Sequence, residues 1–129
     1  MDSGDGKTMA LVEDDRLVRE SFKDCIESAD YLVRDFDSAE EFLASYEKWN
    51  ADGLILDVRL PKMNGLELHQ ELVERGSTLP VIYVTAHGDA ETCSRAVKQG
   101  AAGFLRKPVN RETLLASIHR ALQHHIERN

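Results

Sequence analysis

Short apolar runs alternate along this chain with longer segments in which apolar residues recur every three or four positions. A short apolar run is typical of a buried strand, and the longer spacing is typical of an amphipathic helix. The pattern predicts five strands that alternate with five helices. The predicted strands are Met9–Val12, Tyr31–Phe36, Leu54–Leu56, Val81–Val84 and Ala101–Leu105.

Strict alternation of strands and helices is typical of a parallel sheet that carries helices on both faces. The runs Leu54–Leu56 and Val81–Val84 place apolar residues on both faces of their strands, as a sheet covered on both sides requires. The expected fold class is therefore α/β, with a five-stranded parallel sheet and five helices.

Residues suited to helix ends support these limits. Aspartate, serine and asparagine side chains can accept hydrogen bonds from the free amides of a first helical turn, and a glutamate three residues later can complete a capping box. The candidate N-caps are Asp15, Ser38, Asn64 and Asn110, with Glu41 and Glu67 as the partners of Ser38 and Asn64. Gly76 and Gly100 stand where the third and fourth helices are expected to end.

Among the predicted helices, the fourth has the weakest apolar face. The residues expected to face the core are Leu66, Leu68, Leu72 and Val73 in the third helix, and Cys93, Ala96 and Val97 in the fourth. His69 is interpreted as a surface residue of the third helix. The fourth helix, over about residues 90–99, has a narrow apolar face of mostly small side chains and is expected to be loosely anchored.

Length and composition indicate one domain with one core, since the chain has 129 residues. Residues 1–6 are expected to form a disordered leader, residues 7–125 the folded domain, and residues 126–129 a C-terminal tail or the start of a linker. A formal net charge of −7 argues against direct binding to nucleic acid. No apolar run approaches the ~18 residues of a membrane helix, and no secretory signal is recognisable. We therefore expect a cytoplasmic protein that does not contact a membrane, with Cys25 and Cys93 as reduced thiols.

Polar residues follow four of the predicted strands. Glu13 and Asp14 follow the first, Asp57 the third, Thr85 the fourth and Lys107 the fifth. The carboxyl ends of parallel strands share one edge of the sheet, so these side chains are expected to converge there. Clustered carboxylates repel one another unless a cation intervenes, and oxygen ligands favour Mg²⁺, which commonly shares its coordination shell with phosphate. A carboxylate can also be the nucleophile that forms an aspartyl phosphate.

Four stretches of sequence carry a resemblance to a known family. They are Leu-Val-Glu-Asp-Asp at 11–15, Leu-Asp-Val-Arg-Leu-Pro-Lys-Met-Asn-Gly at 56–65, Val-Thr-Ala at 84–86 and Leu-Arg-Lys-Pro at 105–108. With these the chain resembles the receiver domains of bacterial two-component response regulators over about residues 7–125, and more loosely the receivers attached to transcription activators. The resemblance implies a flavodoxin-like, receiver-type fold and a role in phosphorelay signalling rather than as an enzyme.

The resemblance also implies a role for each site residue. Asp57 is similar to the family's phosphoacceptor, the residue that receives a phosphoryl group from a sensor histidine kinase. The implied Mg²⁺ ligands are Asp14 directly, Asp57, the backbone carbonyl of Arg59, and Glu13 mainly through water. Lys107 and Thr85 are implied to bind phosphoryl oxygens, Thr85 and Phe104 to form the switch, and the Lys107-Pro108 peptide bond is often cis in this family. Two residues differ from the commonest pattern, since Glu13 stands where aspartate is frequent and Phe104 where tyrosine is also common.

Arg59 and His87 lie two residues beyond Asp57 and Thr85, respectively. Their side chains are positioned to flank a phosphoryl group and to alter the access of water. We hypothesise that they set the lifetime of the phosphorylated state.

Two other functions and two outputs stay open at this point. A Mg²⁺-dependent phosphohydrolase with an aspartyl-phosphate intermediate commonly has a second acid two residues after the nucleophile, where this chain has Arg59. A docking module that works without phosphorylation would be favoured by the loss of a site residue, yet all are present: Glu13, Asp14, Asp57, Thr85 and Lys107. The output of a receiver would be binding, either to a C-terminal effector domain or to a second copy of the chain.

Overall fold

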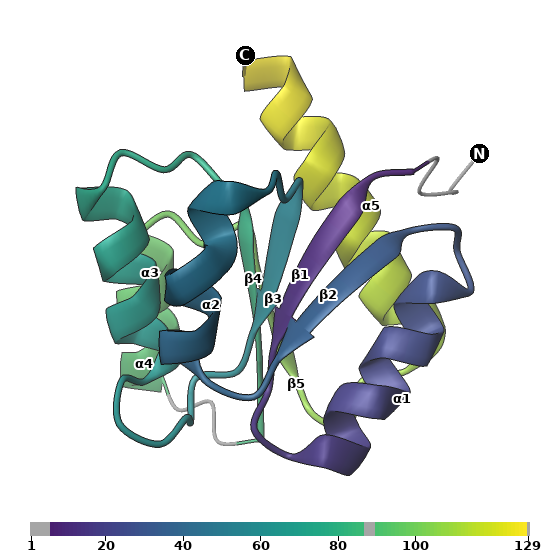
Figure 1. Ribbon diagram of the computed structural model, residues 1–129, viewed down its shortest axis with the longest axis horizontal. Coiled ribbons are helices and arrows are strands. Elements are labelled where there is room, and N and C mark those ends of the chain that lie inside the picture. Colours follow the sequence, from purple (N-terminus) through teal and green to yellow (C-terminus); the bar gives the residue numbers. More distant parts are fainter. Residues whose placement is uncertain (1–5, 87–89, 129) are drawn as a thin grey trace.

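The computed structural model describes residues 6–86 and 90–128, the last five of them by their backbone alone. Within these residues five strands form one parallel sheet in the order β2-β1-β3-β4-β5 (Figure 1). The strands are β1 Thr8–Val12, β2 Leu32–Phe36, β3 Gly53–Leu56, β4 Val81–Thr85 and β5 Gly103–Arg106. The predicted strands and the α/β fold class are thus confirmed, and each strand begins and ends within two residues of its expected limits.

Helices cover both faces of this sheet. They are α1 Arg16–Glu27, α2 Ala39–Ser45 with a short 3₁₀ turn at Tyr46–Lys48, α3 Gly65–Glu74, α4 Ala90–Lys98 and α5 Arg111–Arg128. Figure 1 shows α1 and α5 on one face and α2, α3 and α4 on the other. None of the helices in the described part of the chain has the length and apolar character needed to cross a bilayer.

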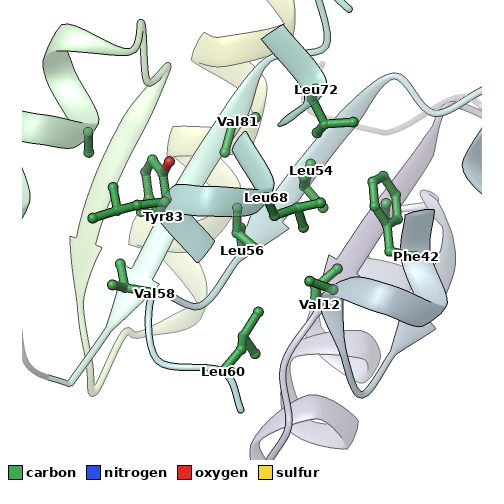
Figure 2. Close-up of a cluster of buried hydrophobic side chains, with 14 residues drawn as sticks. Val12, Phe42, Leu54, Leu56, Val58, Leu60, Leu68, Leu72, Val81 and Tyr83 are labelled. Carbon is green, nitrogen blue, oxygen red and sulfur yellow. The ribbon is translucent and has the colours of Figure 1, made fainter. Parts of the chain in front are cut away.

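The core consists of two layers, one on each side of the sheet. Leu54 and Leu56 of β3 contribute to the layer under α2, α3 and α4, whereas Ile55 contributes to the layer under α1 and α5. Figure 2 shows Phe42 of α2 and Leu68 of α3 with the strand residues of the first layer. Because side chains alternate across a strand, a strand between two layers must be almost entirely apolar, which is the pattern of β3 and of Val81–Val84 in β4.

The predicted helix caps are present. The Asp15 carboxylate accepts a hydrogen bond from the Val18 amide at 3.1 Å, and the corresponding bonds from first-turn amides to Ser38, Asn64 and Asn110 are 3.1, 2.9 and 2.8 Å long. The bond is reciprocal at Asn64, whose amide donates to the Glu67 carboxylate at 2.9 Å. Asp15 and Asn64 therefore fix the starts of the two helices that follow β1 and β3.

The burial expected for α3 is wrong at two positions. Val73 is 50% exposed, whereas His69 is only 4% exposed. The buried face of the helix runs along Gly65, Leu68, His69 and Leu72, and this places Val73 outside it. His69 can be buried because its Nδ1 atom lies 2.8 Å from the Tyr83 hydroxyl on β4, so each polar group satisfies the other.

The apolar face of α4 is narrower than expected. Ala96 is fully buried, but Val97 is 63% exposed and Cys93 is half-buried. Gln99, the residue that follows α4, also contacts α3, because its side-chain amide donates to the Leu66 carbonyl at 3.3 Å. Such a small apolar contribution is in keeping with loose anchoring, which stays a prediction.

Acidification should destabilise this protein partly through His69. Burial lowers the pKa of His69 below its ordinary value of 6.5, so the unfolded chain takes up a proton more readily than the native state. Stability from this group is complete above about pH 6.5 and is lost as the pH falls, by at most about 1.4 kcal/mol per pH unit. Urea unfolding at several pH values should therefore give a flatter acid limb for His69→Gln, which keeps an acceptor for Tyr83 but does not titrate. Equal slopes in the two proteins would contradict this assignment.

Candidate functional site

Three acidic residues meet at the carboxyl edge of the sheet, the lower edge in Figure 1. Glu13 and Asp14 follow β1, and Asp57 follows β3. One carboxylate oxygen from each lies within 4.8 Å of the others. Glu13 is 2% exposed and Asp57 7%, while Asp14 is exposed. The predicted convergence of these three residues is thus present, with two buried acids beneath one accessible acid.

Backbone hydrogen bonds beyond the ends of the strands position the acids. The Glu13 amide donates to the Phe36 carbonyl, and the Asp57 amide donates to the Val12 carbonyl, both at 3.1 Å. Asp57 Oδ1 accepts a hydrogen bond from the Arg59 amide at 3.1 Å, so one oxygen of this carboxylate is held by the loop that follows it. The parallel pairing of β1 with β2 and β3 therefore determines where the acids lie.

Lys107 brings the end of β5 into the same cluster. Its Nζ atom lies 2.5 Å from Glu13 Oε1 and 3.0 Å from Asp57 Oδ2. Its amide donates to the Thr85 carbonyl at 2.9 Å, which ties the β5 end to the β4 end. The Lys107-Pro108 bond is cis, as the resemblance implied. A single ammonium group thus bridges both buried carboxylates.

Burial and the charges of neighbouring groups have opposing effects on the pKa values of Glu13 and Lys107. Burial raises the pKa of Glu13 from 4.5 to about 7, and the negative charge of Asp57 adds to that shift, although the hydrogen bond from Lys107 opposes it. Burial alone would lower the pKa of Lys107, but its bonds to Glu13 and Asp57 outweigh burial and raise it. Lys107 therefore stays an ammonium at neutral pH, and Glu13 is the acid whose ionisation depends on nearby positive charge.

The remaining predicted site residues lie around this cluster. Thr85 is fully buried at the last position of β4. Phe104 is half-buried on β5, with its ring centroid 5.9 Å from that of Tyr83. The side chain of Arg59 is exposed, and His87 lies outside the described residues. The phosphoryl-binding, switch and rate-tuning roles of these residues stay predictions.

Gly65 is a site residue that the sequence reasoning missed. It stands at the first position of α3, where its amide donates to the Val58 carbonyl at 2.9 Å. An added Cβ would overlap the Asp57 carbonyl oxygen and lie 2.9 Å from the Val58 Cα. In the sequence, Asn64 with Glu67 predicts the helix start and gives Gly65 no role of its own, whereas in the structure the glycine allows the helix to approach the backbone of Asp57.

Gly65→Ala should therefore both destabilise the fold and displace Asp57. Two rigid backbone segments would have to separate, with an expected loss of about 1–3 kcal/mol in urea unfolding. Gly76→Ala is the matched control, because Gly76 has a φ of +83° and an alanine there is strained at the far end of the same helix. The phosphorylation that the resemblance implies should be slower in Gly65→Ala than in Gly76→Ala, and equal rates would contradict the role assigned to Gly65.

The donors at this edge fit a hard divalent cation. Glu13, Asp14 and Asp57 offer only oxygen atoms, and the backbone carbonyl of Arg59 follows Asp57 by two residues. Oxygen-only ligands close together favour Mg²⁺ over a transition metal. The exposed Asp14 carboxylate leaves one side of the cluster accessible to an ion and to phosphate.

An apolar groove adjoins the acidic cluster. It has a volume of about 500 Å³ and includes Leu17 and Phe22 of α1 on one side and Pro108 and Val109 on the other. Leu17 is 70% exposed. Because Lys107 also lines the groove, the apolar surface reaches the chemical site itself.

Comparison with known protein sequences finds the same family in two ways, through a family model and through individual relatives. A family model described as the response regulator receiver domain matches residues 9–119. The chain is 39% identical over 120 residues to the transcriptional regulatory protein TdiR of Thauera aromatica, an alignment that covers 93% of this chain and 53% of TdiR.

Solved structures agree with the sequence matches. A CheY-like receiver domain protein from Methanospirillum hungatei is 28% identical with a TM-score of 0.90, covering 96% of this chain and 99% of that one. Full-length FixJ from B. japonicum is 31% identical with a TM-score of 0.86, covering 92% of this chain but 59% of FixJ. The chain spans about half the length of the relatives TdiR and TodT of Pseudomonas putida.

Proposed function

We propose that this chain, which belongs to the response regulator receiver family, accepts a phosphoryl group on Asp57 and thereby changes a binding surface. The observation that carries the proposal is the position of Asp57. Its carboxylate is buried at the end of β3, lies within hydrogen-bond distance of Lys107, and shares the cluster with two further acids. A nucleophile for phosphoryl transfer needs nearby positive charge, and this site supplies it.

The chemical step is an in-line displacement. An oxygen of the Asp57 carboxylate forms a bond to phosphorus as the P–N bond of a phosphohistidine donor breaks. The second ring nitrogen of the donor carries a proton, so the products are an acyl phosphate and a neutral imidazole. Lys107, already 3.0 Å from Asp57 Oδ2, is placed to hold a phosphoryl oxygen, and Thr85 is proposed to donate its hydroxyl to another. When bound by Glu13, Asp14, Asp57 and the Arg59 carbonyl, Mg²⁺ supplies positive charge to the phosphoryl oxygens.

The signal is proposed to leave the site through Thr85 and Phe104. Thr85 ends β4, and Phe104 lies on the neighbouring β5 with its ring beside Tyr83. Drawing Thr85 toward a phosphoryl group changes the space open to the Phe104 ring and alters the surface around α4. The small apolar contribution of α4 suits an element with two states of similar energy.

The proposed partners are a sensor histidine kinase, and either an effector domain or a second copy of the chain. The apolar groove beside Lys107 supports a protein donor, because the exposed Leu17 and the Lys107 of the acidic cluster line the same groove, and exposed apolar surface suits contact with another protein. The relatives are about twice as long as this chain, which supports residues 7–125 as a receiver unit within a regulator of transcription. We further propose a cytoplasmic location and no direct contact with nucleic acid, in keeping with a net charge of −7.

The phosphorylation experiment described below also tests two other functions, a phosphohydrolase and a docking module. A phosphohydrolase would turn over a phosphate ester continuously, and the exposed Arg59, where such enzymes carry a second acid, disfavours it. A docking module independent of phosphorylation would have no use for two buried acids bridged by Lys107.

The test is incubation with acetyl phosphate, followed by measurement of the intact mass with and without Mg²⁺. We expect the gain of one phosphoryl group that requires Mg²⁺ and is prevented by EDTA. Loss of phosphate from a small ester without a stable adduct would favour the hydrolase. Absence of an adduct, together with no binding of fluoroberyllate as a phosphoryl mimic, would favour the docking module.

The exposed side chain of Arg59 is proposed to limit the access of water to the acyl phosphate. Arg59→Ala should shorten the lifetime of the phosphorylated protein, measured by the decay of the adduct mass after removal of the donor. Lys62→Ala is a suitable control, since Lys62 is an exposed cation of the same loop. An unchanged decay rate in Arg59→Ala would make the hypothesis wrong, and His87→Ala tests the second residue in the same way.

A further inference from the structure

We propose that Arg19 is a positioning residue that sets the Mg²⁺ affinity of the acidic loop formed by Glu13 and Asp14. This inference deepens the proposed function and rests on it. Arg19 lies in the first turns of α1 and is 16% exposed at its side chain. Arg19 lies outside the four stretches that carry the family resemblance, and an arginine on a surface helix is ordinarily solvated, so the sequence alone does not predict this role.

The guanidinium group of Arg19 joins the acidic loop to strand β2. Its Nη1 atom donates to the Glu13 carbonyl at 2.8 Å and more weakly to the Asp14 carbonyl at 3.5 Å. Its Nε atom donates to Asp35 Oδ2 at 3.2 Å. Asp35 is held in register beside Leu11 of β1, so the arginine is anchored on a rigid strand.

These bonds restrain the backbone at the point where it leaves the sheet. Past Val12 the chain no longer belongs to β1, although the Glu13 amide still bonds to Phe36. Because a peptide unit is planar, holding the Glu13 carbonyl also fixes the orientation of the Asp14 amide that shares its plane. Arg19 therefore restrains the backbone from which the Asp14 carboxylate projects.

The restraint matters because the three acids repel one another. Without it, the exposed Asp14 can turn away from the buried Glu13 and Asp57, and a cation must then bring it back at a cost in affinity. Residues that orient metal ligands from behind typically change affinity by about 10- to 100-fold when removed. A planar guanidinium can bond a carboxylate and two carbonyls at once, which a lysine ammonium cannot do with the same geometry.

Charge alone would have the opposite effect. Arg19 is a cation close to a cation site, so its removal would strengthen Mg²⁺ binding if Coulomb repulsion were the only influence. Asp35 bonds Arg19 and also pairs with Lys23 at 3.3 Å, and it partly neutralises this charge. The sign of the change in affinity therefore distinguishes positioning from simple electrostatics.

The experiment is calorimetric titration of the whole chain with Mg²⁺ alone. We expect the dissociation constant to rise about tenfold in Arg19→Ala and by less in Arg19→Lys. Lys23→Ala is the matched control, because Lys23 pairs with the same Asp35 but, within the described part of the chain, makes no hydrogen bond or ion pair with the acidic loop. Asp35→Asn, which keeps Arg19 but weakens its anchor, should give an intermediate value and provides a second test if Arg19→Ala does not fold.

A second readout separates positioning from general destabilisation. The rate of phosphorylation by acetyl phosphate should fall in Arg19→Ala at low Mg²⁺ and recover at saturating Mg²⁺, which a loss of folded protein would not do. An unchanged or tighter Mg²⁺ affinity in Arg19→Ala and Arg19→Lys, with phosphorylation of the parent intact, would overturn this inference alone. Absence of both Mg²⁺ binding and phosphorylation in the parent would overturn the proposed function with it.

Discussion

Asp57→Asn should show no phosphorylation by acetyl phosphate with Mg²⁺ present, while remaining folded. The amide nitrogen of asparagine cannot act as the nucleophile, and its oxygen carries too little charge to form an acyl phosphate. The replacement keeps an oxygen that can accept the hydrogen bond of the Arg59 amide, so the loop after β3 loses little support. Intact mass gives the adduct, and circular dichroism with urea unfolding confirms that the variant is folded.

Asp15→Asn is the matched control for this loss. Asp15 is adjacent in sequence to Asp14, yet its carboxylate caps α1 by accepting from the Val18 amide. Asparagine and aspartate are nearly equivalent as N-caps, so Asp15→Asn should be phosphorylated as the parent is. An adduct that persists in Asp57→Asn would place the acceptor elsewhere and contradict the assignment of Asp57.

Much of this site follows from the sequence because parallel strands end at one edge. Once Leu54–Leu56 and Val81–Val84 are recognised as buried parallel strands, the residues after them must lie at the same edge of the sheet whatever the order of the strands. The helix caps are predicted equally well, since Asp15 and Asn64 act within a few residues of their own position. The resemblance then supplied roles that position alone does not give, such as that of Phe104.

The features that the sequence did not reveal depend on partners that lie outside the residue's own helix. The burial of His69 depends on the hydroxyl of Tyr83, 14 residues away on another element. The tight packing of Gly65 depends on the backbone of Asp57. The hydrogen bonding of Arg19 depends on where β2 places Asp35. In each case the residue type is compatible with an exposed helix, and only the tertiary arrangement assigns it a contact.

Lys107→Ala should also have a large effect, because it should lower both the rate of phosphorylation and the free energy of unfolding. The substitution removes the only ammonium that bridges Glu13 and Asp57 among the described residues. Loss of a preorganised charge at a reacting oxyanion costs about 100-fold in rate or more, so the rate of phosphorylation at saturating Mg²⁺ should fall by that factor. Lys107→Arg keeps the positive charge and should retain more of the rate.

The loss of stability in Lys107→Ala should depend on pH in a defined direction. The pKa of Glu13 is already about 7 with Lys107 present, and without the ammonium it should rise further. An acid whose pKa is higher in the native state than in the unfolded chain destabilises the fold as the pH rises above about 4.5, the ordinary value. Near pH 5 Glu13 is protonated in the folded protein and the variant should lose little.

At about pH 8 an unpaired buried carboxylate should lower the free energy of unfolding of Lys107→Ala by about 3 kcal/mol. Urea unfolding at both pH values measures this difference. Added Mg²⁺ should restore much of the loss at the higher pH, because it replaces the missing positive charge beside the same oxygens. A deficit that is equal at both pH values would mean that Lys107 acts through packing rather than charge. The pH dependence and the Mg²⁺ rescue together therefore test whether a single countercharge holds the buried acids ready for phosphoryl transfer.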